Sequence, residues 1–133
     1  MELSAVHYGL FPHESGMSPE VGAGPWHQLD GEVRLCFKDA PDAFVSWGNG
    51  PPQHCVEIRD GSFFSTQALR YVEMSGHPFW REVVGGPVSI VHSGAERQVV
   101  RLMGPAASAY LSTQSADGTF HSDCIRVGQA DAT

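Results

Sequence analysis

Histidine and cysteine side chains recur with similar spacing at two places in the sequence. His54 is followed by Cys55, and His121 is followed by Asp123 and Cys124. Imidazole nitrogens and thiolates are ligands that zinc prefers in proteins, and a thiolate, an imidazole and a carboxylate together make up a nucleophilic triad. The sequence therefore suggests two kinds of site, a zinc site and a cysteine nucleophile. Both require the fold to bring these two segments together.

The local arrangement argues against both chemistries. Adjacent residues of a strand point to opposite faces, so His54 and Cys55 cannot easily enter the same ligand sphere. A nucleophilic thiolate also requires an electropositive pocket, and the formal charge of this chain is -7. Because free cysteine is usually a small buried apolar side chain, we expect no metal site, no cofactor and no catalytic residue, and hence no enzyme.

The motifs that identify a reaction are absent from the sequence. It contains no G-x-S-x-G, no HExxH, no Walker loop and no C-x-x-C. The arginines are scattered singly along the chain, and we expect them on a solvated sheet face. With 15 acidic residues against 8 basic ones, the chain offers no basic surface for phosphate groups, so nucleic acid is not an expected partner.

The length and composition of the chain favour a single soluble domain. A chain of 133 residues closes one core, and we expect residues 1–133 to form one domain in which residues 1–25 are loosely held. No segment provides the roughly 20 apolar residues that span a bilayer. The 3 cysteines, an odd number at wide spacing, fit free thiols in a reducing cytoplasm. We therefore expect a cytoplasmic bacterial protein that is a monomer or a homodimer and does not bind membranes.

Alternating hydrophobicity predicts a mainly β fold. Residues 32–38 alternate apolar and polar or small side chains, as a half-buried strand does. Asn49-Gly50 and Asp117-Gly118 are typical of hairpin turns. The spacing predicts an antiparallel meander, arranged as a sandwich or a partly open barrel. Further strands are expected at residues 43–47, 54–59, 88–92, 98–103, 108–113 and 119–127.

The stretch between residues 66 and 85 departs from this pattern. Residues 66–76 fit either a short helix or an edge strand. Residues 77–85 resemble a helical turn, with Pro78 near the start and Gly85 at the end. We therefore expect one or two short helices around residues 66–84.

Two parts of the chain share an ordered series of similar phrases, from which we expect two pseudo-repeats at residues 26–64 and 80–127. Trp26-x-x-Leu29-x-Gly31 is similar to Trp80-x-x-Val83-x-Gly85. The phrases that follow pair as Val33-Arg34-Leu35 with Val100-Arg101-Leu102, Phe44-Val45-Ser46 with Tyr110-Leu111-Ser112, and Cys55-Val56 with Cys124-Ile125.

The W-x-x-[LV]-x-G phrases at Trp26 and Trp80, the V-R-L strands and the acidic composition resemble the small single-domain immunity proteins that bacteria encode beside secreted polymorphic toxins. The resemblance covers roughly residues 26–127. It implies a cytoplasmic protein that binds and blocks a cognate toxin domain. Nuclease toxins carry basic clefts, and an acidic partner would be steered toward such a cleft. We therefore expect a non-enzymatic protein-binding module.

The candidate partner-binding residues are one aromatic anchor and a set of polar and acidic side chains near predicted turns. Trp47 adjoins a loop stiffened by Pro51 and Pro52, and tryptophan is enriched at interface hot spots. Acidic side chains at turns can pair with a basic partner. The predicted partner-binding residues are Asp39, Asp42, Trp47, Asn49, Asp60, Glu73 and Glu82.

Two other classes of function remain open from the sequence. Small antiparallel barrels can enclose a cavity lined by aromatic side chains, so a small-ligand-binding β-barrel or a small enzyme with a pocket inside the sheet is the alternative. An exposed strand edge could also pair two copies of the chain in an assembly.

Overall fold

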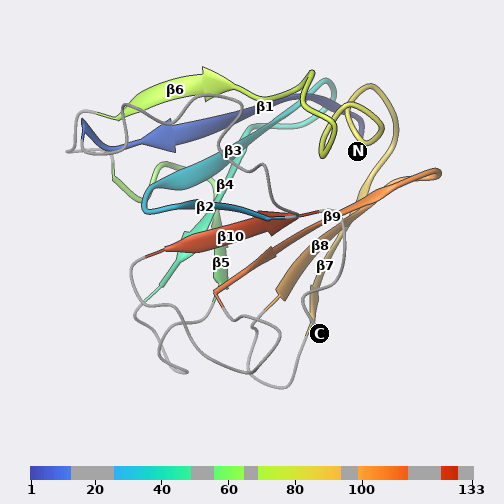
Figure 1. Ribbon diagram of the computed structural model, residues 1–133. Coiled ribbons are helices and arrows are strands. Elements are labelled where there is room, and N and C mark those ends of the chain that lie inside the picture. The colour runs from blue at the N-terminus through green and yellow to red at the C-terminus, as the bar shows by residue number, and fades with distance from the viewer. Residues whose placement is uncertain (13–25, 49–55, 65–68, 94–98, 114–123, 129–133) are drawn as a thin grey trace.

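The described residues of the computed structural model form ten β-strands in two five-stranded antiparallel sheets (Figure 1). The structure describes residues 1–12, 26–48, 56–64, 69–93, 99–113 and 124–128. The prediction of a mainly β fold is confirmed. The two sheets share one core and do not close into a barrel.

The first sheet has the strand order β5-β4-β3-β1-β6. Its two hairpins, β3 with β4 and β4 with β5, join strands that are consecutive in the chain, whereas β1 pairs with both β3 and β6. The strands are β1 (Leu3–Leu10), β3 (Glu32–Phe37), β4 (Ala43–Trp47), β5 (Val56–Arg59) and β6 (Arg70–Glu73).

The second sheet has the order β2-β10-β9-β8-β7. Four of its strands form a meander of consecutive strands, and β2 is added at the free edge of β10. The strands expected at residues 32–38, 43–47, 54–59, 88–92, 98–103, 108–113 and 119–127 are each present in their described parts, whereas β1 and β2 were not expected. The strands are β2 (Trp26–Leu29), β7 (Ser89–Ser93), β8 (Val99–Met103), β9 (Ser108–Ser112) and β10 (Ile125–Gly128).

The core is built by the alternation of strand residues. In β3, Val33 and Leu35 are fully buried, whereas Arg34 points to the other face and is only half-buried. In β8, Val100 and Leu102 are buried in the same alternating way. These side chains belong to one cluster of apolar residues contributed by both sheets, so the opposite face of each sheet points away from the shared core.

The first ten residues correct one expectation. Residues 1–25 are not loosely held as a whole, because β1 lies inside the first sheet between β3 and β6. Val6, Tyr8 and Leu10 alternate into the core with a period of two, which stabilises β1 by apolar burial as well as by its two ladders. Residues 13–25 lie outside the described residues.

The stretch around residues 66–84 corrects a second expectation. Residues 70–73 form the edge strand β6, and no helix forms in the described part of this stretch. The carbonyls of His77 and Trp80 each accept two backbone hydrogen bonds, giving tight turns that end at Gly85 with φ of 94°. Such short turns form too few backbone hydrogen bonds to offset the entropy cost of nucleating a helix. Among the described residues there is no helix long and apolar enough to cross a membrane.

The V-R-L phrases and the phrases at residues 44–46 and 110–112 occupy matching positions in the two sheets, whereas residues 26–29 form strand β2 and the similar residues 80–84 form turns. Arg34 pairs with Phe44 across β3 and β4, and Arg101 pairs with Tyr110 across β8 and β9. Each guanidinium lies over its aromatic partner, at 5.6 Å in the first sheet and 5.4 Å in the second. The flanking pairs also match: Val33 with Val45 and Leu35 with Ala43 in the first sheet, Val100 with Leu111 and Leu102 with Ala109 in the second.

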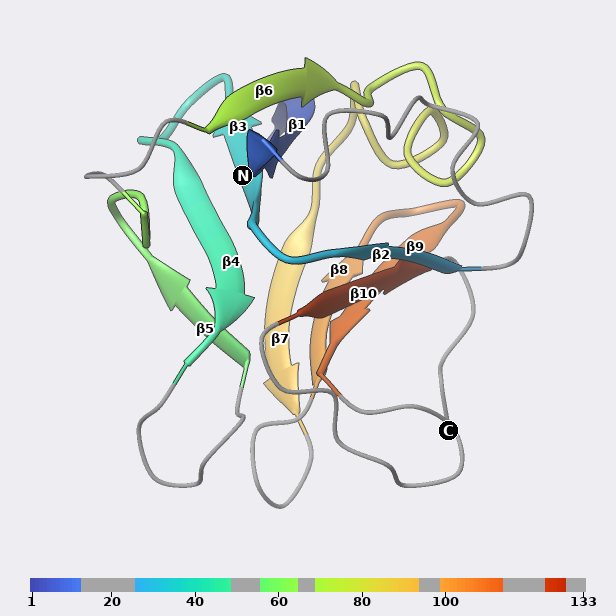
Figure 2. The ribbon, with the colours of Figure 1, turned by 60° about the vertical axis from the view of Figure 1, so that its left-hand side comes forward.

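The chain crosses between the sheets at the junction of β2 and β3 (Figure 2). Asp30 and Gly31 form this junction, and a Cβ atom on Gly31 would lie 1.8 Å from the carbonyl oxygen of Gly9. Only glycine allows so close an approach of two backbones. The crossing places His27 of β2 beneath β1, where it contacts Tyr8.

Candidate functional site

A row of five side chains crosses all five strands on the outer face of the first sheet. The strand register places them in the order Arg59, Phe44, Arg34, His7 and Glu73, each paired with the next. We call these five residues the cross-strand row. They lie on the face opposite the core because neighbouring residues of each strand point inward.

Arg34, at the centre of the cross-strand row, is held from three sides. Its guanidinium carbon lies 5.6 Å from the ring centroids of both Phe44 and Tyr71. Its Nε and Nη2 atoms donate hydrogen bonds of 2.9 and 2.6 Å to Oδ2 of Asp42, and this contact raises the pKa of Arg34. The side chain is still 39% exposed. A cation and two aromatic rings are thus presented to solvent in a fixed arrangement.

Cys36 neighbours this row. It has a histidine beside its thiol, as a reactive cysteine does, but its thiol lacks the lowered pKa of a reactive cysteine. Its Sγ atom lies 3.8 Å from Nδ1 of His7. Burial, assisted by the negative charge of Asp42, raises the pKa of the Cys36 thiol. The thiol is therefore protonated at neutral pH, and a protonated thiol is a poor nucleophile.

Two of the predicted partner-binding residues, Asp42 and Glu73, lie at the cross-strand row. Asp42 holds Arg34, and Glu73 ends the row on β6. Asp39 is exposed near Asp42, and its Oδ1 accepts a 3.0 Å hydrogen bond from the backbone N–H of Glu2, which lowers the pKa of Asp39.

The other predicted residues are not brought to this row. Trp47 is half-buried on the core-facing side of β4, and its Nε1 donates a 3.2 Å hydrogen bond to the carbonyl of Asp30. Asp60 and Glu82 are exposed elsewhere on the described surface. Asn49 lies outside the described residues. The structure thus assembles part of the predicted set around an arginine that was not in it.

Glu32 is a fully buried carboxylate with three hydrogen-bond donors. Its oxygens accept hydrogen bonds from the Ser62 hydroxyl at 2.7 Å, from the backbone N–H of Phe63 at 2.8 Å and from the Tyr71 hydroxyl. These contacts tie the turn after β5 and strand β6 to β3. Glu32 therefore has a structural task, which includes holding the Tyr71 ring beside Arg34.

A second group of polar side chains is buried between the sheets. Trp80 Nε1 donates a 2.9 Å hydrogen bond to the Tyr8 hydroxyl, and this hydroxyl lies 2.8 Å from Nδ1 of His27. The three side chains are 0%, 5% and 2% exposed, respectively. Because the Tyr8 oxygen accepts from Trp80, its own proton is free to be donated to His27. We call this chain of hydrogen bonds the buried relay.

The buried relay fixes the protonation of His27. Burial raises the pKa of Tyr8, so its hydroxyl keeps its proton and donates to Nδ1. Burial and the nearby His77 lower the pKa of His27 to about 4, so the ring is neutral at pH 7. A neutral ring that accepts at Nδ1 carries its proton on Nε2. No protein atom among the described residues accepts a hydrogen bond from this Nε2.

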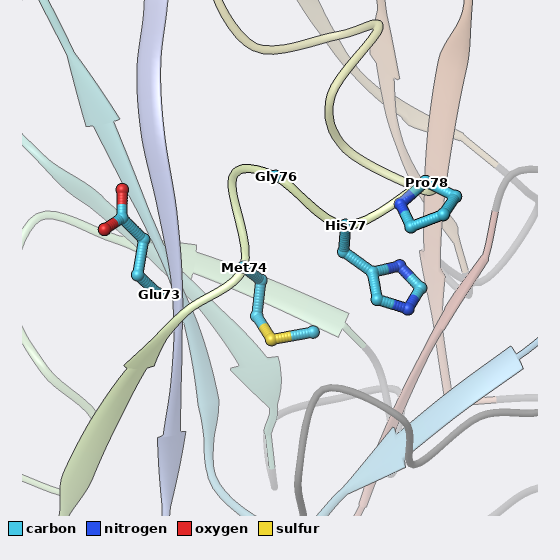
Figure 3. A pocket seen from close by; sticks show the side chains of 5 residues that line it. All are labelled: Glu73, Met74, Gly76, His77 and Pro78. Atoms are coloured by element: carbon cyan, nitrogen blue, oxygen red, sulfur yellow. The ribbon is translucent and has the colours of Figure 1, made fainter.

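A hollow of about 370 Å³ lies next to the buried relay and is lined by Glu73, Met74, Gly76, His77 and Pro78 (Figure 3). The side chains of Met74 and His77 point to the same side of the turn, whereas the Glu73 carboxylate points away from them. The His77 ring contacts the His27 ring edge-on, with 4.4 Å between centroids. His77 thus connects the hollow with the buried relay.

The metal chemistry considered from the sequence finds no support among the described residues. No group of three or more His, Cys, Asp or Glu side chains assembles there in a geometry that could hold a metal ion. Cys36 is a free thiol, and Cys124 is buried. The other members of the two segments, His54, Cys55, His121 and Asp123, lie outside the described residues.

Sequence reasoning did not identify His27, Tyr8 or His77 as site residues. The alternation of Val6, Tyr8 and Leu10 was a usable signal for an inward-facing tyrosine. Nothing in the sequence indicates that this tyrosine meets Trp80, because the two residues are 72 positions apart.

Comparisons of the chain with protein-family models, with curated proteins and with solved structures find no match. The function is therefore inferred from the chain's own residues.

Proposed function

We propose that this chain is a protein-binding module that presents the outer face of its first sheet to a partner. The observation that carries the proposal is the arrangement at Arg34, a partly exposed guanidinium fixed by Asp42 and stacked against Phe44 and Tyr71. Arginine and tyrosine are among the residue types that dominate binding energy at protein interfaces.

The fixed geometry supports binding because it lowers the cost of association. Immobilising a flexible side chain at an interface costs about 0.5–1.5 kcal/mol. The bonds from Arg34 to Asp42 and from Tyr71 to Glu32 order both side chains before a partner arrives. The partner then meets two anchors that are already in place.

The net charge of the chain points to a basic partner. Of the 15 acidic residues, six lie outside the described ranges, against one of the 8 basic residues. The described surface is thus nearly balanced, and much of the excess negative charge belongs to the remaining segments. The field of the whole chain, at a formal charge of -7, would speed encounter with a positively charged surface.

We further propose that the partner is a toxin domain and that binding neutralises it, as the resemblance to immunity proteins implies. In this proposal the protein acts in the cytoplasm and without catalysis: the face around Arg34 binds the toxin beside a basic cleft, with the acidic side chains of that face toward the cleft, and so excludes the substrate. The predicted residues Asp39, Asp42 and Glu73 lie where they could pair with basic side chains of such a cleft.

A growth assay tests this function. The chain is used as bait in the lysate and secreted fraction of its source cell, and the captured protein is expressed in a host with and without the chain. We expect the captured protein to arrest growth alone and growth to be restored by co-expression of the wild-type chain.

The matched variants make the assay specific for the proposed face. Arg34→Ala should fail to restore growth, whereas Arg101→Ala, which removes the equivalent cation–aromatic pair from the second sheet, should restore it. Circular dichroism establishes that both variants fold. A captured protein that is harmless, or rescue by folded Arg34→Ala equal to that by the wild type, would contradict the proposal.

A further inference from the structure

Strand β6 forms a free edge of the first sheet, next to the cross-strand row. It pairs with β1 on one side, and no described strand pairs with its other side. Arg70, Tyr71 and Glu73 are exposed, whereas Val72 is half-buried. An edge strand with exposed backbone can take up an additional strand from another chain.

The register shows which backbone groups of β6 are available to such a strand. In an antiparallel pair, opposed residues alternate between those that exchange backbone hydrogen bonds and those that do not. The N–H of Met74 donates a 2.8 Å hydrogen bond to the carbonyl of Val6, and this bond fixes the alternation along the register of β1 and β6. Val72 therefore bonds to β1, whereas the N–H and C=O groups of Tyr71 and Glu73 point away from β1, toward the free edge.

The Glu73 side chain determines which charge the added strand must carry. Glu73 ends the cross-strand row, and its carboxylate points away from Met74 and His77 (Figure 3). This carboxylate accepts a 3.2 Å hydrogen bond from the Ser75 hydroxyl and forms no ion pair among the described residues. Opposite charges stabilise a cross-strand pair and like charges destabilise it. The row is therefore best continued by a lysine or an arginine opposite Glu73.

The two neighbouring positions of β6 complete the pattern. Tyr71 lies on the same face as Glu73 and is 37% exposed, so a β-branched or aromatic side chain opposite it would add a favourable cross-strand contact. Val72 packs against the core, so the residue opposite it is expected to be apolar. In an antiparallel strand these requirements fall on three consecutive residues: a basic residue, an apolar residue, and a β-branched or aromatic residue.

We propose that the partner protein adds an antiparallel strand to β6 and places a lysine or an arginine opposite Glu73. Antiparallel pairing is slightly more stable per residue than parallel pairing. This inference rests on the proposed protein-binding function and deepens it, because the added strand extends the cross-strand row that contains Arg34. A basic residue opposite Glu73 also agrees with the formal charge of -7, which favours a positively charged partner.

A synthetic strand tests this edge without the captured protein. The probe is the peptide acetyl-Ser-Thr-Arg-Val-Thr-Ser-amide, in which arginine, valine and the threonine after it lie opposite Glu73, Val72 and Tyr71. The peptide is titrated into the ¹⁵N-labelled wild-type chain while amide hydrogen exchange is followed by NMR. At a peptide concentration of about twice the Kd, we expect exchange of the Tyr71 and Glu73 amides to slow about threefold. The Val72 amide, which already bonds to β1, should show no such change.

Three modified peptides separate strand pairing from charge alone. Methylation of the backbone nitrogens of arginine and the threonine after valine blocks the hydrogen bonds to β6, so we expect this peptide not to bind. Methylation at valine should leave the affinity within about twofold, because this N–H points away from β6. Glutamate in place of arginine should weaken binding about threefold or more, because it places like charges opposite each other.

Variants locate the contact within the chain. Glu73→Pro removes an N–H that faces the free edge and leaves the ladder with β1 intact, whereas Glu73→Gln removes only the charge. We expect Glu73→Pro to bind the unmodified peptide at least about tenfold more weakly than the wild type, and Glu73→Gln about threefold more weakly. Glu82→Gln, which removes an exposed carboxylate outside β6, is the control and should bind as the wild type does. If Glu73→Pro does not fold, the modified peptides on the wild-type chain decide the matter.

The proposal is overturned if the unmodified peptide at millimolar concentration leaves exchange of the Tyr71 and Glu73 amides unchanged. It is also overturned if the peptide methylated at arginine and threonine binds as well as the unmodified one, or if the arginine and glutamate peptides bind with equal affinity. None of these results depends on the captured protein or on Arg34→Ala in the growth assay. Failure of the strand pairing is therefore distinguishable from failure of the protein-binding function.

Discussion

Acid should destabilise this fold through His27 in particular. The ring is buried and neutral, and its pKa is lowered from 6.5 to about 4 in the folded state. In the unfolded chain the ring takes up a proton near pH 6.5. Between these two pH values the unfolded state binds more protons than the folded state, so stability falls as the pH is lowered. The stability is therefore unaffected by His27 titration above pH 6.5, and the free energy of unfolding falls progressively as the pH is lowered toward 4.

The size of this effect follows from the difference between the two pKa values. Each pKa unit corresponds to about 1.4 kcal/mol, so the interval from 6.5 to about 4 amounts to about 3 kcal/mol. A domain of this size has a total stability of about 5–15 kcal/mol. The acid-dependent loss from a single histidine is thus a large fraction of the total stability.

Urea unfolding at 25 °C measures the effect when it is carried out at pH 7 and pH 4 on matched proteins. His27→Gln removes the titration and keeps a polar side chain, whereas His92→Gln removes an exposed histidine. Carboxylates titrate in all three proteins, so their contribution cancels in the comparison. We expect the wild type and His92→Gln to lose about 3 kcal/mol more than His27→Gln between the two pH values.

The reasoning is refuted if folded His27→Gln loses as much stability as the wild type over this range. Equal losses would mean that His27 is protonated in the folded state, or that it is accessible to solvent. Either result would also remove the buried relay as an account of the His27 tautomer.

Three further substitutions test the packing of the fold by urea unfolding at pH 7. Gly31→Ala should destabilise the fold by about 1–3 kcal/mol, because the new Cβ overlaps a backbone oxygen of β1. The control Gly76→Ala should cost far less, because no atom lies within 4 Å of its Cβ. Equal effects of the two substitutions would contradict the close crossing of the backbones at Gly31. Tyr8→Phe should cost about 1–3 kcal/mol because it leaves Trp80 Nε1 without its acceptor, and an unchanged midpoint would argue against the relay. Glu32→Gln should cost about 1.5–3 kcal/mol because charge-assisted hydrogen bonds are lost, and a neutral outcome would show that the carboxylate is not structural.

The strands that form hairpins were predictable because their signals are local. Residues 32–38 alternate clearly, and β3 forms there with Val33 and Leu35 buried. Strand β1 carries a similar alternation at Val6, Tyr8 and Leu10, but it follows no turn signal and pairs with strands far along the chain. The position of a strand within a sheet is a long-range property that periodicity alone does not contain.

The candidate sites were predictable only in part for the same reason. Asp42 and Glu73 were selected as acidic residues near turns; the register places Glu73 in the cross-strand row, and the contact with Arg34 places Asp42 beside it. Arg34 was expected on a solvated sheet face, and its partial exposure agrees with this expectation. Its stacking between Phe44 and Tyr71 was not expected, because the three residues belong to three different strands. The buried relay likewise joins β1, β2 and the turn at Trp80, so no single segment of sequence reveals it.

Calorimetric titration of the captured partner is the most direct test of the proposed protein-binding face. The partner is titrated against the wild-type chain, Arg34→Ala and Arg101→Ala under the same conditions. We predict that Arg34→Ala raises the Kd at least about 30-fold, since truncation of an interface anchor costs about 2 kcal/mol or more, and that Arg101→Ala leaves the Kd within about twofold. A Kd for folded Arg34→Ala equal to that of the wild type, or a loss of affinity confined to Arg101→Ala, would contradict binding through the outer face of the first sheet.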